Sequence, residues 1–380
     1  MKEIIISNAK IVLPDEVVKG TIRLKDGIIK EFNEGKTSLS NSQDWNGDYL
    51  IPGLIELHTD NMEKYFTPRP GVAWPGIPAI LTHDTQMASA GVTTVFDAVA
   101  VGYNIYKSTR SQILDDVIGS IEYISDNHLA KADHFIHLRC ELSCDSTSDE
   151  FDQNAKTDLL RLVSLMDHAP GQRQFAQMDK YIEYYKGKYN FSDEEMNNNI
   201  ELHQKSSKDF AHIHRRYIAE YCQERGVPMA SHDDATQEHV EEAIDYQVSI
   251  AEFPTTLEAA SFSHENKLKV LMGAPNLVRG YSHSGNVAAR ELADNGCLDI
   301  LSSDYYPSSL LHAAFSLADL DNGYDLPDAI RCVTDNPAQA VDLDDRGRIE
   351  AGKKADILRV TKHKDLPILQ EVWKDGARVN

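Results

Sequence analysis

Short apolar runs, each about the length of a β-strand, recur along the middle of the chain. The eight runs are YLIPGLIEL, GVTTVFDAVAV, HFIHLRCEL, LVSLMDH, GVPMASH, VSIAEF, LKVLMGAP and LDILSSD. Helix-like segments such as SQILDDVIGSIEYISDNHL, SKDFAHIHRRYIAEYCQER and TQEHVEEAIDYQ separate most of them. Strand and helix alternating in this way is typical of an α/β fold with a (β/α)8 barrel. We therefore predict a distorted TIM barrel over residues 49–340.

The two ends of the chain show a different pattern, of short alternating strands with turns. The first 48 residues contain the turn sequences DGII and NGDY, and residues 341–380 contain GRIEAGKKADILRVTKH and ILQEVWKDGARVN. We predict one composite β-sandwich domain built from 1–48 and 341–380. The opening MKEIIISNAKIVL carries an acidic residue beside its lysine and has no small-residue cleavage site, so we expect a first strand there and not a signal peptide.

A long polar segment, roughly residues 169–208, lies between the fourth and fifth runs and is rich in Lys, Glu, Tyr and Asn. A connection of that length usually serves as a lid or as a subunit contact. We expect the protein to form a homo-oligomer, either a dimer or a tetramer.

Composition narrows the class of protein. The chain is 41% hydrophobic and 26% charged, and none of its apolar runs is long enough to span a membrane. Its five cysteines are scattered without a C-x-x-C motif, which favours a cytoplasmic protein over a disulfide scaffold. A formal charge of −22 argues against nucleic-acid partners, and it requires local positive charge wherever an anionic substrate binds.

Polar or ionisable residues close six of the eight apolar runs. They are His58 and Asp60 on the first run, Glu141 on the third, Asp167 and His168 on the fourth, His232, Asp233 and Asp234 on the fifth, Glu252 on the sixth, and Ser303 and Asp304 on the eighth. Functional groups of (β/α)8 barrels collect at the carboxyl ends of the strands. Histidines and carboxylates converging there predict a site for one or two divalent metal ions, with zinc, manganese or iron(II) as candidates.

Some of these residues have a simpler interpretation. A single histidine at a strand end is more often hydrogen-bonded or solvated than a metal ligand, so the prediction depends on the whole set. For Asp233 or Asp234 we expect a role in capping the following helix. For Asp97, in TTVFDA, structural and functional roles are equally plausible.

The segments IPGLIELHTD, MASAGVTTVFDA and GRIEAGKKADILRV resemble the amidohydrolase superfamily, and the resemblance extends over the whole chain. In that superfamily strand one usually gives His-x-His, strand three a glutamate or strand four a carboxylated lysine, strands five and six a histidine each, and strand eight an aspartate. His58, Glu141, His232 and Asp304 match this pattern. Asp60 replaces the second histidine of strand one, and Glu252 stands in the place of the strand-six histidine.

The resemblance implies both the metal ligands and the catalytic residues. The implied ligands are His58, Asp60, Glu141, His168, His232, Glu252 and Asp304. Asp304 would act as general base towards water activated by the metal, with His232 as a second catalytic residue. The carboxylates Asp60 and Glu252 make a harder, more anionic ligand set, which suits phosphate oxygens.

Six further blocks resemble one branch of the superfamily that acts in phosphonate breakdown. They are HTDNMEKYFTPRPGVAWP, MDHAPGQRQF, ASHDDAT, AEFPTT, GAPNLVRGYSHSGN and LSSDYYPSSLL. This resemblance implies hydrolysis of a ribose 5-triphosphate to the 5-phosphate and diphosphate, so the expected partner is a small phosphorylated sugar.

A triphosphate requires cations and N–H donors, and the loop after the seventh run supplies the best candidates. They are Arg279, Ser282, His283, Ser284 and Asn286, with Gly280 and Gly285 allowing backbone N–H groups to approach phosphate oxygens. Lys64, Arg69 and Arg173 add possible charge from the loops after the first and fourth runs.

Two alternative functions stay open. The chain could hydrolyse a C–N bond, as a deacetylase, deaminase or cyclic amidase. It could also be a catalytically silent barrel that serves as a scaffold. The Arg279 loop and the missing histidines argue against the first alternative, and the cost of keeping a polar cluster argues against the second.

Overall fold

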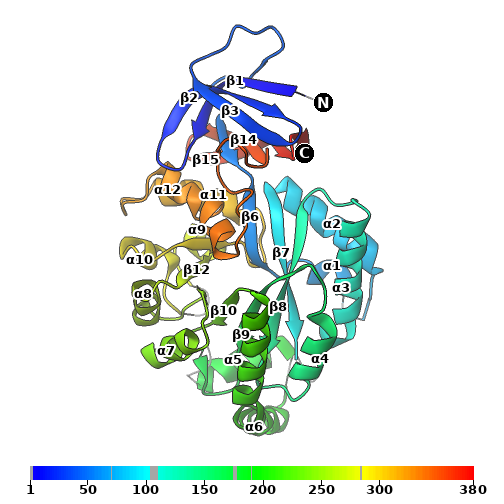
Figure 1. Ribbon diagram of the computed structural model, residues 1–380. Helices are drawn as coiled ribbons and strands as arrows, with labels where there is room; N and C mark the ends of the chain where they lie inside the picture. Colours follow the sequence, from blue (N-terminus) through cyan, green and yellow to red (C-terminus); the bar gives the residue numbers. More distant parts are fainter. Residues whose placement is uncertain (1–2, 70, 103–109, 174–177, 190, 283–284) are drawn as a thin grey trace. The chain divides into compact units, whose positions relative to one another are not determined.

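The computed structural model describes residues 3–69, 71–102, 110–173, 178–189, 191–282 and 285–380. Helices and strands alternate through the middle of the chain, and strands make up most of its two ends (Figure 1). The chain divides into two compact units. The first unit is Met1–Asp97, Tyr123–His134 and Met272–Asn380, and the second unit is Ala98–Glu122 and Phe135–Leu271.

Both ends of the chain enter one sheet within the first unit. Its strands are β1 (Glu3–Val12), β2 (Val17–Lys25), β3 (Ile28–Glu34), β4 (Gln43–Asp44), β5 (Tyr49–Pro52), β14 (Ile357–His363), β15 (Leu366–Lys374) and β16 (Ala377–Arg378). They follow the order β16-β15-β14-β5-β1-β2-β3, and β4 pairs with β1. Strand β5 runs parallel to β1 and antiparallel to β14, so it joins the two chain ends. The prediction of a small β domain built from both ends is confirmed.

A buried apolar cluster forms the core of this sheet. In β2, Ile22 and Leu24 are buried while the residues between and beside them are partly exposed, the period of two expected of a strand with one solvated face. Ile6 and Ile11 of β1 and Trp373 of β15 join the same cluster. Alternation in the sequence therefore sets which face of the sheet is buried.

The second sheet is the predicted barrel. Its strands are β6 (Leu54–Thr59), β7 (Val92–Val101), β8 (Asp133–Glu141), β9 (Leu160–Met166), β10 (Met229–His232), β11 (Ile250–Glu252), β12 (Lys269–Gly273) and β13 (Ile300–Ser302). They follow one another in chain order from β6 to β13. A parallel bridge between Thr59 and Asp304 closes the seam between the first and last strands. Each of the eight apolar runs overlaps one barrel strand, so the barrel prediction is confirmed.

The first apolar run is divided between the two sheets at Gly53. Residues before it form β5 of the first sheet, and residues after it form β6 of the barrel. A Cβ atom on Gly53 would lie 2.2 Å from the Thr93 hydroxyl oxygen, so only glycine allows the chain to pass there. The first sheet therefore includes Tyr49–Pro52, beyond the boundary at residue 48 that the sequence predicts for the β domain.

The helices occupy most of the connections between barrel strands. They are α1 (Glu63–Phe66), α2 (Gly76–Ser89), α3 (Arg110–Asp126), α4 (Thr147–Asn154), α5 (Met178–Tyr189), α6 (Asp193–Arg225), α7 (Gln237–Asp245), α8 (Leu257–Glu265), α9 (Ala274–Arg279), α10 (Ala289–Asp294), α11 (Ser309–Ala318), α12 (Leu326–Arg331) and α13 (Asp335–Ala340). Within the described chain, every helix is too short or too polar to cross a lipid bilayer.

Much of the long polar insertion is helical. Helix α6 begins well before the segment that the sequence pattern marks as a helix, because Ser192 and Glu195 form a capping box at its start. It ends at Gly226, which adopts a left-handed conformation with φ of 64°. Buried Tyr181 and Tyr185 of α5 pack in one apolar cluster with Met196 of α6.

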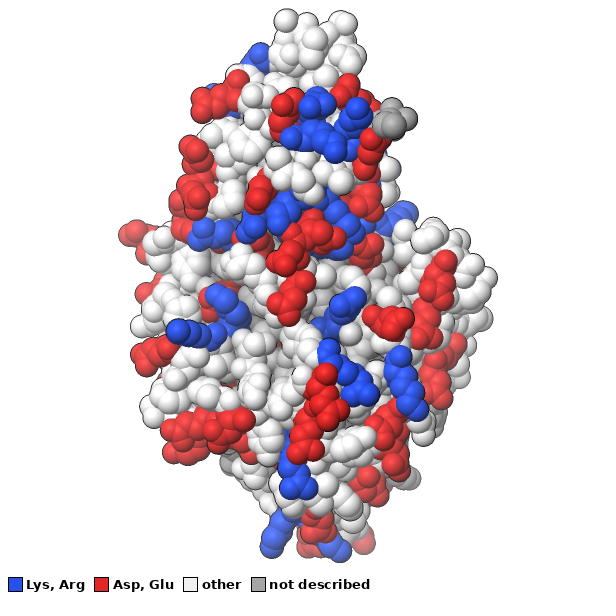
Figure 2. Space-filling model, viewed as in Figure 1, with Lys and Arg blue, Asp and Glu red and all other residues white. Residues whose placement is uncertain are grey.

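Acidic and basic side chains are interspersed over the face drawn in Figure 2. On this face the acidic side chains therefore do not gather in a single area. An anionic substrate must rely on cations placed locally at the site.

Candidate functional site

The carboxyl ends of β6 and β13 meet in the first unit and hold three predicted ligands. His58 lies near the end of β6, Asp60 comes directly after it, and Asp304 follows β13. The Asp304 backbone N–H donates to the His58 carbonyl oxygen at 3.2 Å. The Thr59 hydroxyl donates to the Asp304 carbonyl oxygen at 2.6 Å. Backbone contacts therefore fix the positions of His58 and Asp304 relative to each other.

Glu56 ties the same two strand ends together. Its Oε1 accepts the His58 backbone N–H at 2.8 Å, and its Oε2 accepts the Ser303 backbone N–H at 2.6 Å. The Ser302 hydroxyl donates to Oε1 as well. Burial raises the pKa of the Glu56 carboxyl to about 7, although the donors from Ser302 and Ser303 act in the opposite direction. Glu56 is a supporting residue that sequence reasoning missed, because in LIELHT it looks like an ordinary strand residue.

A chain of buried or half-buried histidines and carboxylates follows the strand ends of the second unit. Glu141, the last residue of β8, accepts from His168 Nδ1 at 2.6 Å. His168 Nε2 lies 3.5 Å from Asp233 Oδ2, and His232 Nε2 lies 3.4 Å from the same oxygen. His232 Nδ1 lies 2.9 Å from Glu252 Oε2. The structure therefore brings four predicted ligands of this unit into one network.

The middle of this network fits a divalent metal ion. One ligand atom from each of His168, His232 and Asp233 lies within 4.8 Å of the others. Burial lowers the pKa of His168, but the neighbouring Glu141 and Asp233 raise it to about 10, so a proton supplies the positive charge in this environment. A metal ion would replace that proton, because ligands bind metals in their deprotonated form. Imidazole nitrogen and carboxylate oxygen are donors that zinc, manganese and iron(II) accept.

The prediction that Asp233 or Asp234 caps the following helix is wrong. The Thr236 hydroxyl accepts the His239 backbone N–H at 3.4 Å and caps α7 instead. Asp234 accepts from the Ser231 hydroxyl, while Asp233 faces the two histidines. Asp233 is therefore a candidate metal ligand that the sequence interpretation missed, although it stands beside His232 in ASHDDAT.

Just after three of the barrel strands, a non-glycine residue adopts the left-handed backbone conformation. Asp233 follows β10 with φ of 56°, Phe253 follows β11 with φ of 54°, and Asp304 follows β13 with φ of 56°. Such conformations cost on the order of 1 kcal/mol or more and concentrate at functional sites. Two of the three residues are carboxylates of the candidate site.

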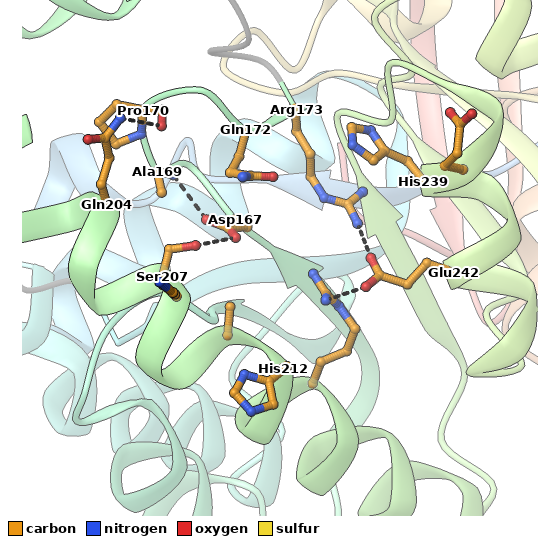
Figure 3. A pocket seen from close by; sticks show the side chains of 14 residues that line it. Asp167, Ala169, Pro170, Gln172, Arg173, Gln204, Ser207, His212, His239 and Glu242 are labelled. Atoms are coloured by element: carbon orange, nitrogen blue, oxygen red, sulfur yellow. Dashed lines mark hydrogen bonds and ion pairs between the residues drawn. The ribbon is translucent and has the colours of Figure 1, made fainter.

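Arg173 borders a cavity of about 690 Å³ in the second unit (Figure 3). Loop 167–173, helix α6 and helix α7 line this cavity. The Arg173 guanidinium pairs with Asp234 and, at 2.9 Å, with Glu242, whose other oxygen pairs with Arg215 at 2.6 Å. It also donates to the His232 carbonyl oxygen at 3.4 Å. These contacts favour a role in holding the loop after β10 over direct contact with substrate.

Arg279 is an exposed cation at the end of α9, where Gly280 terminates the helix with φ of 80°. Its guanidinium lies 4.6 Å from the ring centroid of Tyr281 and bonds to the side chains of Tyr281 and Tyr305. Because Tyr305 directly follows Asp304, this contact places Arg279 near the carboxyl end of β13.

The other predicted substrate-binding residues lie in two segments of the first unit. Ser282 and Asn286 are half-buried on the loop after α9, whereas His283 and Ser284 lie outside the described residues. Lys64 and Arg69 are exposed on the segment that follows β6, and Lys64 Nζ donates to Asn61 Oδ1 at 2.5 Å.

Asp97 lies within β7, several residues before its end, and is fully buried. Its Oδ1 lies 2.8 Å from His83 Nε2, and its Oδ2 lies 2.7 Å from His134 Nδ1. Asp97 therefore belongs to a second histidine–carboxylate cluster that no motif in the sequence indicates.

Comparison with known proteins identifies the family. The amidohydrolase family matches residues 161–379, which is more than half of the chain. The alpha-D-ribose 1-methylphosphonate 5-triphosphate diphosphatase of Escherichia coli (strain K12) is 48% identical over 376 residues, covering 99% of this chain and 100% of that protein. The chain belongs to the amidohydrolase family, and it is a hydrolase.

Solved structures with the same fold have much lower sequence identity. The 5-methylcytosine deaminase of Klebsiella pneumoniae has a TM-score of 0.66 at 15% identity, covering 99% of this chain and 98% of that one. The N-acetylglucosamine-6-phosphate deacetylase of Pasteurella multocida has a TM-score of 0.63 at 12% identity, covering 99% of each chain. These similarities establish the fold of a barrel with a small β domain.

Proposed function

We propose that this enzyme hydrolyses alpha-D-ribose 1-methylphosphonate 5-triphosphate to the 5-phosphate and diphosphate, as a step in phosphonate breakdown. The observation that carries the proposal is the 48% identity, over nearly the whole chain, to the Escherichia coli enzyme named for that substrate. The strand-end carboxylates and the exposed cations after β6 and β12 support it, because they suit a phosphorylated substrate.

We propose that divalent metal ions bind at the carboxyl ends of the barrel strands. The proposed ligands are His58, Asp60, Glu141, His168, His232, Asp233, Glu252 and Asp304. When bound, such ions lower the pKa of water and neutralise charge on phosphoryl oxygens. Zinc, manganese and iron(II) all suit this donor set, and one or two ions per subunit are compatible with its size.

Asp304 is the proposed acceptor of the proton that the attacking water gives up. Its backbone is fixed by the His58 carbonyl and the Thr59 hydroxyl, so its carboxylate has a defined position at the strand end. His232 is held between Glu252 and Asp233, which keeps the orientation of its ring fixed during the reaction. A positioned base of this kind typically contributes a factor of about 10²–10⁴ in rate.

Arg279 is the proposed partner for a phosphate group of the substrate. We expect Arg279→Ala to raise KM about tenfold while kcat changes less than about threefold, because the substitution removes a charge that binds substrate and transition state alike. Steady-state kinetics check this expectation. Arg378→Ala removes an exposed arginine of the first sheet and serves as the control. An unchanged KM in Arg279→Ala would contradict the assignment.

Phosphorus NMR tests the proposed reaction. The purified enzyme is stripped of metal, reloaded with manganese or zinc, and given the ribose 1-methylphosphonate 5-triphosphate. Metal-dependent release of diphosphate is the expected result and places the cut at the α–β bond. Release of single orthophosphate would move the cut to the terminal phosphate, and absence of turnover with every metal would favour hydrolysis of a C–N bond or a catalytically silent scaffold.

Assembly and location stay predictions. We propose a homo-oligomer, dimer or tetramer, and sedimentation velocity of the metal-loaded enzyme checks it. We also propose a cytoplasmic enzyme, which the scattered free cysteines support.

A further inference from the structure

Four ionisable side chains are buried together in the first unit, and the proposed reaction uses none of them. Asp97 lies within β7, His134 near the start of β8, and His83 and Asp84 on α2. Their exposed fractions are 0%, 3%, 0% and 1%. Burying charged groups costs free energy unless each is paired, so the way they pair indicates their role.

Three hydrogen bonds link the four side chains of this cluster. Asp97 Oδ1 lies 2.8 Å from His83 Nε2, and Asp97 Oδ2 lies 2.7 Å from His134 Nδ1. His134 Nε2 lies 3.3 Å from Asp84 Oδ1. Each oxygen of Asp97 therefore has a hydrogen-bond partner of its own. Although the ligand atoms of His83, Asp97 and His134 lie within 4.8 Å of one another, these hydrogen bonds satisfy them with protons alone.

Asn61 fixes the direction of the hydrogen bonds at one end of the cluster. Lys64 has only N–H donors, so the Asn61 atom that faces Lys64 Nζ at 2.5 Å is the carbonyl oxygen. The Asn61 amide nitrogen then faces both His83 Nδ1 and Gln86 Oε1 at 3.0 Å. His83 Nδ1 must accept one of these hydrogens. The ring proton of His83 consequently lies on Nε2 and is donated to Asp97.

We propose that Asp97, His83 and Asn61 form a positioning relay that holds the Lys64 ammonium group for the phosphates of the substrate. The inference rests on the proposed function, since it gives Lys64 an anionic ligand. Lys64 is exposed, so a solute reaches it, yet its Nζ is anchored through Asn61 to buried groups.

The relay is also connected to the strand ends that hold the proposed base. The Asn61 backbone N–H donates to the Thr59 hydroxyl oxygen at 3.3 Å, and that hydroxyl donates to the Asp304 carbonyl oxygen at 2.6 Å. A free lysine loses up to about 2 kcal/mol of side-chain entropy when it is fixed in place. A lysine that is already held loses less on binding, so the relay lowers KM by preorganisation.

Two substitutions of His83 each keep one of its two hydrogen bonds and remove the other. In His83→Gln the amide nitrogen takes the place of Nε2, so the bond to Asp97 is kept and the acceptor for Asn61 is lost. In His83→Asn the carbonyl oxygen takes the place of Nδ1, so the acceptor is kept and the bond to Asp97 is lost. We expect His83→Gln to raise KM about tenfold with kcat within about threefold. We expect His83→Asn to raise KM less and to lower Tm more.

Lys64→Met shows whether the effect passes through Lys64. In that background, His83→Gln is expected to change KM by less than about twofold, because the group that the relay positions is absent. Full additivity of the two substitutions would overturn the relay. The exposed His363→Gln serves as the control, with kinetics and Tm like those of the native enzyme.

Nitrogen-15 NMR of the histidine rings tests the relay without any turnover. We expect neutral His83 with its proton on Nε2, and a doubly protonated or metal-bound His83 would overturn the proposal.

If the native enzyme released no diphosphate, the proposed function would fail without deciding whether the relay exists. The relay would then be tested by the affinity for inorganic triphosphate. We expect His83→Gln to bind it about tenfold more weakly than the native enzyme, and equal affinity would contradict the relay.

Discussion

Two histidine–carboxylate clusters in this enzyme share residue types but differ in their spacing. In the first unit, Asp97 bonds to His83 and His134 at 2.8 and 2.7 Å, one oxygen for each ring. In the second unit, the Nε2 atoms of His168 and His232 face a single oxygen of Asp233 at 3.5 and 3.4 Å. The first set of distances is that of hydrogen bonds, and the second is longer. In both clusters the ligand atoms lie within 4.8 Å of one another, and the longer distances of the second cluster leave more room for a cation between them.

The two clusters also differ in their place along the strands. The second cluster occupies carboxyl ends of barrel strands, where substrates reach (β/α)8 barrels. The first cluster lies within β7, at the start of β8 and on α2. Residue type alone therefore does not identify a metal site. Two features indicate whether protons or an ion fill a cluster. One is the distance between its ligand atoms, and the other is which end of the strand carries them.

Removing a ligand of the second cluster is expected to have the largest effect. We expect His168→Ala to lower bound metal and to reduce kcat on the order of 10³-fold, more than the 10- to 100-fold typical of outer-shell partners. His134→Gln, in the first cluster, is expected to retain the native metal content. Elemental analysis of dialysed protein measures both. Equal loss of metal in the two variants would show that the clusters are not different in kind.

The strand-end carboxylate and the mid-strand carboxylate are expected to respond differently to loss of charge. Asp304→Asn is expected to reduce kcat on the order of 10²–10³-fold with Tm nearly unchanged, because the amide cannot accept a proton. Asp97→Asn is expected to lower Tm, since it leaves the buried His134 without its main partner. Steady-state kinetics and thermal unfolding compare the two variants. Near-native turnover in Asp304→Asn would remove it as the base.

The barrel was predictable because its signals are local. Each buried strand is a short apolar run, and the polar residues that close these runs mark the strand ends at which His58 and Asp304 lie. The start of α6 was not found, because its first half is polar and its onset depends on the capping box of Ser192 and Glu195.

The parts of the site that sequence reasoning missed depend on contacts between distant residues. His83, Asp97 and His134 are separated by 14 and 37 positions and share no motif. In the sequence Arg173 resembles a free cation, whereas in the fold it pairs with the carboxylates of Asp234 and Glu242. No single-sequence pattern records which buried carboxylate a given cation meets, so such pairings come only from the fold.

The smallest expected effect is on how the free energy of unfolding depends on pH, because the two clusters bind protons differently when metal is present. Burial lowers the pKa of His134, but Asp97 and Asp84 raise it to about 10, and His168 has a similar value while no metal is bound. In the unfolded chain both rings lose their proton near the ordinary value of about 6.5. Between these two pH values the folded state holds more protons than the unfolded state, so the free energy of unfolding falls as pH rises.

One such proton contributes a slope of up to about 1.4 kcal/mol per pH unit. Metal-free enzyme holds two of these protons, whereas metal-loaded enzyme holds only that of His134, because the ion displaces the other. We therefore expect the alkaline slope, measured by urea unfolding between about pH 7 and 9.5, to be about twice as steep without metal. In the metal-loaded enzyme, His134→Gln is expected to remove most of this dependence of the free energy of unfolding on pH. In the metal-free enzyme, it is expected to halve the slope. The exposed His363→Gln is the control and is expected to change neither slope. An identical slope with and without metal would mean that no ion displaces the His168 proton, and the second cluster would then be filled by protons like the first.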